Sequence, residues 1–125
     1  MIPTWANMLA VLKKIRTEAA TGDCGCVLGI CAAARWQMVD LLHVGDYGND
    51  SYECRDHCDS MIARLFREVG YDPVYPIFDD TNEDYASPMA QYDYLPHWEG
   101  RQLELRIELL DKCINYLEAG NEPVV

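Results

Sequence analysis

Lysine and arginine are absent from residues 68–100, a stretch that holds eight of the chain's 21 acidic residues. The whole chain has only ten lysines and arginines, so its formal net charge is -11. Such a surface repels phosphate groups, which argues against direct binding of nucleic acid or of anionic membranes. The same charge favours a partner with a basic surface.

Long apolar runs are also missing. No stretch approaches the roughly 20 apolar residues that span a bilayer. Near the N-terminus, Lys13 and Lys14 follow the apolar residues, whereas a secretory signal peptide has its basic residues first. We therefore expect a cytoplasmic protein without membrane contact, whose six cysteines are reduced thiols.

Motifs of known catalytic sites are absent as well. The sequence contains no glycine-rich phosphate loop, no nucleophile elbow and no paired-acid motif. Its three histidines, His43, His57 and His97, stand in no catalytic pattern. We predict that the chain is not an enzyme.

Helical periodicity dominates what is present. The 125 residues, half of them hydrophobic, predict a single helical domain over residues 1–125, mainly α, with about four helices packed as a small bundle. The first helix follows Thr4, a suitable N-cap, and ends at Gly22. Its apolar residues recur at helical spacing: Trp5, Met8, Leu9, Leu12, Ile15 and Ala19.

The other helices have less uniform signals. We expect a second helix over residues 27–43, or one that starts only after Gly29. A third begins at Asp50 or Ser51, with a capping box that Glu53 completes, and stops at Gly70. Arg55 and Asp59 are expected to pair on its solvent face. The last helix covers about residues 98–118, and Gly120 ends it.

Residues 71–96 show no helical period because four prolines interrupt them. We predict a long irregular segment, acidic and rich in aromatic residues, in which residues 74–78 and 91–95 are candidates for a short two-stranded ribbon. Its aromatic rings can bury enough apolar area to order it. Exposed tyrosines beside carboxylates suit an interface for arginine and lysine. The residues predicted to contact a partner are Asp79, Asp80, Glu83, Asp84, Tyr85 and Tyr92.

A zinc site is the sharpest alternative. Cys24 and Cys26 form one cluster of thiols, and Cys54 and Cys58 form a second one on a single helix face. Four thiolates can hold one tetrahedral zinc ion, although neither pair has the common Cys-x-x-Cys spacing. The competing interpretation is that Cys31, Cys58 and Cys113 are small buried hydrophobic residues on the apolar faces of helices, and that the protein binds no cofactor.

Three short motifs occur in a familiar order. They are Gly29-Ile30-Cys31, Tyr75-Pro76-Ile77, and Trp98-Glu99-Gly100 followed by a helix rich in leucine and arginine. This order resembles a group of small, uncharacterised proteins encoded by bacteriophages and prophages, over about residues 25–118. The acidic stretch at residues 79–87 departs from that group. The resemblance implies a small accessory protein that acts in the bacterial cytoplasm during infection.

Three functions follow as hypotheses. In the first, the acidic segment mimics nucleic acid, and the chain binds and inhibits a host protein, for example a nucleic-acid-binding defence component. In the second, the chain sequesters a signalling nucleotide in a pocket lined by the recurring motifs, with Arg35, Arg64 or Arg106 offsetting the negative charge. The third is a fold stabilised by zinc.

Overall fold

The computed structural model describes residues 2–21, 30–45, 48–70 and 102–124. These residues form four helices, α1 (Trp5–Thr21), α2 (Ile30–Leu42), α3 (Asn49–Glu68) and α4 (Gln102–Glu118), and they contain no strand. The predicted mainly α fold with four helices is therefore confirmed. The proposed ribbon strands, residues 27–29 of the second helix and residues 98–101 of the last lie outside the described residues.

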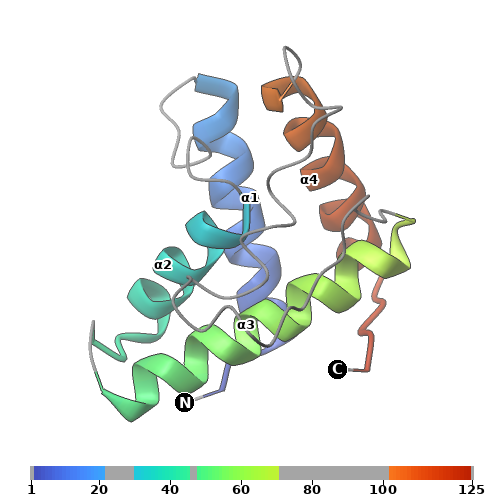
Figure 1. Cartoon of the computed structure of the whole chain (residues 1–125). Coiled ribbons are helices and arrows are strands. Elements are labelled where there is room, and N and C mark those ends of the chain that lie inside the picture. The colour runs from blue at the N-terminus through green and yellow to red at the C-terminus, as the bar shows by residue number, and fades with distance from the viewer. Residues whose placement is uncertain (1, 22–29, 46–47, 71–101, 125) are drawn as a thin grey trace, which may run out of the picture.

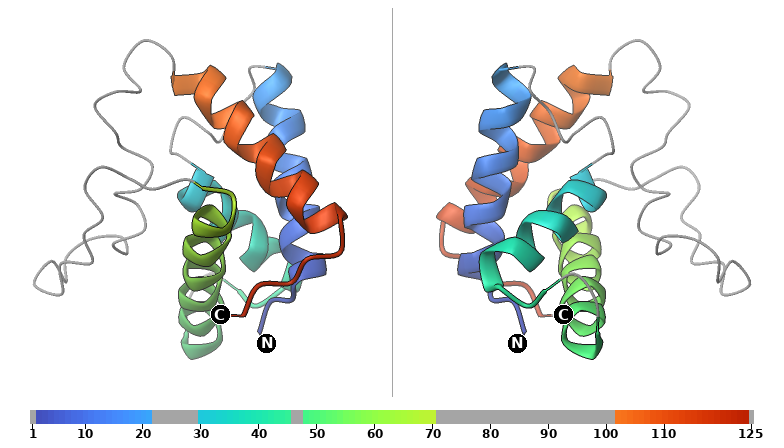
Figure 2. Two further views of the ribbon diagram at one scale, coloured as in Figure 1. Left: turned by 90° about the vertical axis from the view of Figure 1, so that its right-hand side faces the viewer. Right: turned by 90° about the vertical axis from the view of Figure 1, so that its left-hand side faces the viewer.

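Helix α1 lies between α2 and α4, and α3 crosses in front of them (Figure 1). Helix α1 packs on both α2 and α4, and α2 also packs on α3. The two side views agree with this order, and they place the start of α1 beside the segment that follows α4 (Figure 2). There, the indole N–H of Trp5 donates a hydrogen bond of 3.0 Å to the carbonyl oxygen of Pro123.

A single apolar cluster joins the four helices. The apolar residues predicted for the first helix contribute Met8, Leu12 and Ile15 to it. Burying a large aliphatic or aromatic side chain contributes about 1.5–3 kcal/mol, so this cluster is the main source of stability. Its largest fully buried side chains are Met8, Leu12, Ile15, Ile30, Met38, Met61, Ile62, Leu65, Phe66 and Leu110.

Thr4 caps α1 as predicted, through a reciprocal pair of hydrogen bonds. The backbone N–H of Asn7 donates to Thr4 Oγ1 at 3.1 Å, and the backbone N–H of Thr4 donates to Asn7 Oδ1 at 2.9 Å. Two backbone donors at the helix start are thereby satisfied. At the other ends, Gly70 and Gly120 adopt positive φ angles and stop α3 and α4, as predicted.

The predicted start of the third helix is wrong. Helix α3 begins at Asn49, its N-cap is Gly48, and no side chain caps it. Ser51 is buried inside the first turn, so it cannot serve as the cap, and Asp50 already lies within the helix. Gly48 has a φ of 111°, a conformation open to glycine, and this angle starts the helix earlier than the side-chain signals indicate.

Candidate functional site

The six residues predicted to contact a partner lie outside the described residues, and so do Cys24 and Cys26. The partner interface at Asp79, Asp80, Glu83, Asp84, Tyr85 and Tyr92 therefore stays a prediction. The described helices supply two other surface features, an aromatic patch between α2 and α3 and a pocket between α1 and α2.

The structure describes two of the four cysteines predicted to bind zinc. Cys54 and Cys58 lie one turn apart on α3, and both are fully buried free thiols. Burial raises the pKa of both thiols, and the neighbouring carboxylate of Asp59 raises that of Cys58 further, so the neutral form is favoured without a metal. Within the described residues, no three metal-binding side chains of His, Cys, Asp or Glu gather. Zinc binding by the four cysteines stays a prediction.

The expected Arg55–Asp59 pair on the solvent face is wrong. Asp59 is buried and accepts two hydrogen bonds of 2.7 Å from the guanidinium of Arg35, from Nε to Oδ1 and from Nη2 to Oδ2. The two side chains are only 13% and 8% exposed. This bidentate pair joins α2 to α3, and Asp59 faces the neighbouring helix because α2 packs against that side of α3.

Several other bases are also paired with carboxylates of the chain itself. Lys13 lies 3.6 Å from Glu118, Arg16 lies 2.7 Å from Asp111, and Arg64 lies 2.7 Å from Glu68. Arg35 and Arg64, two of the arginines proposed to attract a nucleotide, are thus engaged. Each pair neutralises one positive and one negative charge, so the chain's excess of carboxylates, 21 against ten lysines and arginines, is unchanged.

Trp36 on α2 and Tyr52 on α3 form an exposed aromatic patch together with Arg55. Their side chains are 54% and 59% exposed. The guanidinium carbon of Arg55 lies 5.1 Å from the centroid of the Trp36 ring and 5.9 Å from that of Tyr52. Both distances are within the range of a cation–π interaction. We call these three residues the α2–α3 patch.

Sequence reasoning missed this patch. Residues 27–42 are apolar almost throughout, so the sequence does not separate Trp36 from the core residues around it. A signal was available: Trp36 stands one turn before Asp40, and Tyr52 one turn before Asp56, and both aspartates are exposed. Residues four positions apart lie on the same face of a helix. An aspartate four residues after the aromatic residue therefore indicates that the ring is on the outer face.

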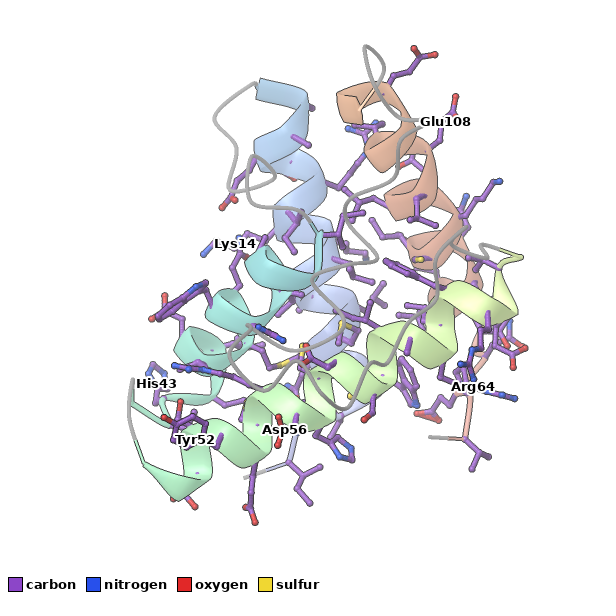
Figure 3. The ribbon with its side chains drawn as sticks, in the orientation of Figure 1. Lys14, His43, Tyr52, Asp56, Arg64 and Glu108 are labelled. Atoms are coloured by element: carbon purple, nitrogen blue, oxygen red, sulfur yellow. The ribbon has the colours of Figure 1, made fainter. Side chains whose placement is uncertain are left out.

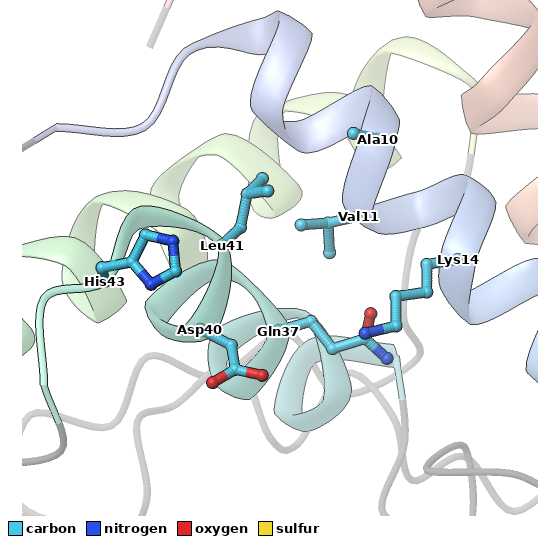
Figure 4. Close-up of a pocket in the computed structure, with 7 residues that line it drawn as sticks. All are labelled: Ala10, Val11, Lys14, Gln37, Asp40, Leu41 and His43. Carbon is cyan, nitrogen blue, oxygen red and sulfur yellow. The ribbon is translucent and has the colours of Figure 1, made fainter.

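Figure 4 shows the pocket between α1 and α2, where Lys14 and Gln37 extend toward each other, below Val11 and Leu41 in this view. Its volume is about 270 Å³, and Ala10, Asp40 and His43 complete its lining. Gln37 Nε2 donates to Glu18 Oε2 at 3.0 Å, while Gln37 Oε1 is buried and has no partner among the described residues. The pocket is lined by one lysine and no arginine, so it has few cationic groups to bind the phosphates of a nucleotide.

The motifs proposed to line a nucleotide pocket are placed only in part. Ile30 is fully buried in the apolar cluster, while Gly29, Tyr75, Pro76 and Trp98 lie outside the described residues. None of the helices in the described part of the chain combines the length and the apolar character required to cross a bilayer.

The resemblance to phage-encoded proteins stays a prediction. Comparison of the chain with known protein families, characterised proteins and solved structures finds no match.

Proposed function

We propose that this chain is a small acidic accessory protein that binds and inhibits a basic protein of a bacterial host, with its carboxylates standing in for the phosphates of nucleic acid. The uneven distribution of charge carries this proposal. Residues 71–101 contain seven acidic residues and a single base, Arg101. A partner that binds nucleic acid presents lysine and arginine side chains, which such a segment attracts.

The ion pairs on the helices support the same proposal. Lys13, Arg16, Arg35 and Arg64 each lie within ion-pair distance of a carboxylate on the helices themselves. Excess negative charge is therefore left for a partner. The bacterial host follows from the resemblance to phage-encoded proteins.

Affinity capture from a bacterial lysate, with quantification by mass spectrometry, tests the proposal. The full chain serves as bait beside two variants that each lose four negative charges. One carries Asp79→Asn, Asp80→Asn, Glu83→Gln and Asp84→Asn. The control carries Glu104→Gln, Glu108→Gln, Glu118→Gln and Glu122→Gln on exposed positions of α4 and the segment after it.

We expect the wild-type chain and the α4 control to recover the same basic protein, and the segment variant to recover about tenfold less of it. Adding the wild-type chain should also release that protein from immobilised double-stranded DNA. Recovery of no protein, or equal recovery by the segment variant, contradicts the proposal. The matched loss of charge separates a local interface from a general effect of net charge.

A further inference from the structure

The two rings of the α2–α3 patch are held in place before any partner arrives. Arg55 contacts both Trp36 and Tyr52, so the side chains of two adjacent helices are joined across the patch. When large side chains are already ordered in the free protein, less conformational entropy is lost on binding. Trp, Tyr and Arg are also the residue types that contribute most to protein–protein affinity.

Two carboxylates share the helix faces that carry the rings. Asp40 lies one helical turn after Trp36, and Asp56 lies one turn after Tyr52. Both are exposed, and neither has an ion-pair partner among the described residues. Figure 3 shows Tyr52 and Asp56 together on α3, far from Glu108 on α4. Two carboxylates against the single charge of Arg55 leave the patch negative.

Aromatic rings beside carboxylates favour a positively charged ligand. An aromatic ring attracts a cation to its face, and Arg55 shows that both rings accept a guanidinium. Each ring has a second face, and the carboxylates nearby can receive the N–H groups of an arginine or a lysine. A phosphate or an acidic peptide would be repelled by the same carboxylates.

We infer that the α2–α3 patch is a docking surface for a basic segment of a protein partner, which lays an arginine or lysine side chain against Trp36 and Tyr52. This inference rests on the proposed function and adds to it a second contact, made by residues of α2 and α3.

The test uses the full chain and a short oligoarginine peptide as the probe, with an oligoglutamate peptide of equal length as the negative control. Dissociation constants are measured by calorimetry, and the indole N–H signals in NMR spectra report on the tryptophans. One variant carries Trp36→Ala and Tyr52→Ala. A second keeps the rings and carries Asp40→Asn and Asp56→Asn, with Glu104→Gln and Glu108→Gln as its matched control.

We expect oligoarginine to shift the indole signal of Trp36, and both patch variants to bind it at least about fivefold more weakly than the wild type. The α4 control should bind nearly as tightly as the wild type. Because both rings are exposed, their loss should leave the helical circular dichroism unchanged, and the carboxylate variant tests the patch with the rings intact.

Three results overturn the inference: no binding of oligoarginine, wild-type affinity in both patch variants, or an equal loss in the α4 control. If affinity falls only when residues 79–84 are neutralised, the α2–α3 patch is not the docking surface, while the proposed function stands. If lysate capture fails although the patch binds oligoarginine, the proposed function fails instead.

Discussion

Two carboxylates of α3 each lie 2.7 Å from an arginine nitrogen, but one ion pair is buried and the other is partly exposed. Asp59 pairs with Arg35 between helices, where both side chains are almost completely buried. Glu68 pairs with Arg64 one turn away on the same helix, where the two side chains are 44% and 30% exposed. A buried charge that loses its partner is costly, whereas water replaces the partner of an exposed one.

Replacing Asp59 with asparagine should therefore destabilise the fold by about 3 kcal/mol or more, since the buried guanidinium of Arg35 loses its counter-charge. Glu68→Gln, the exposed control, should change the free energy of unfolding by less than about 1 kcal/mol. Urea unfolding followed by circular dichroism measures both. An apolar pair, Arg35→Met with Asp59→Leu, should recover most of the lost stability.

Equal, small effects of Asp59→Asn and Glu68→Gln would show that the Arg35–Asp59 pair is as well hydrated as a surface pair. The sequence could not predict this pair. Spacing within α3 pointed to Arg55 as the partner of Asp59, and the identity of the true partner depends on how α2 packs against α3.

Two threonines, one at the start of α1 and one inside it, make different hydrogen bonds to the backbone. Thr4 caps the helix, whereas Thr17 lies inside it and donates its hydroxyl to the carbonyl oxygen of Lys13 at 3.0 Å. A cap satisfies a backbone donor that has no partner in the helix. The hydroxyl of Thr17 bonds a carbonyl that the helix already uses, and threonine is a poorer helix former than alanine.

Substitution by alanine should therefore have opposite effects at the two positions. Thr4→Ala should lower the free energy of unfolding by about 1 kcal/mol, and Thr17→Ala should leave it unchanged or raise it by a few tenths of a kcal/mol. Thr4→Ser keeps the hydroxyl and should behave like the wild type. Chemical denaturation compares the three variants. A loss at Thr17 equal to that at Thr4 would contradict the assigned cap.

The elements themselves could be predicted well where one strong pattern governs them. Apolar spacing identified four helices, and Thr4, Gly70 and Gly120 marked three of their ends. The start of α3 was missed because the backbone angle of Gly48 set it, while Asp50 and Ser51 gave a stronger side-chain signal. Trp36 was missed because a tryptophan in an apolar run looks like a core residue until the neighbouring helix is placed.

At the scale of the whole molecule, charge is divided unevenly along the chain. Four bases of the helices pair with the chain's own carboxylates, and residues 71–101 carry a third of all acidic residues with one base. Composition alone showed this excess. The spacing of Trp36 and Tyr52 from exposed aspartates marks the outer face of each helix, but the α2–α3 patch itself forms only when α2 and α3 pack and bring Arg55 to both rings.

The most direct test of partner binding through clustered carboxylates is the dissociation constant of the complex with the captured basic protein, measured as the salt concentration rises. We predict an affinity that falls steeply with salt for the wild type. The variant neutralised at residues 79, 80, 83 and 84 should bind about tenfold more weakly at physiological ionic strength, with a shallower dependence on salt. The same affinity and the same salt dependence in both proteins would contradict binding through these carboxylates.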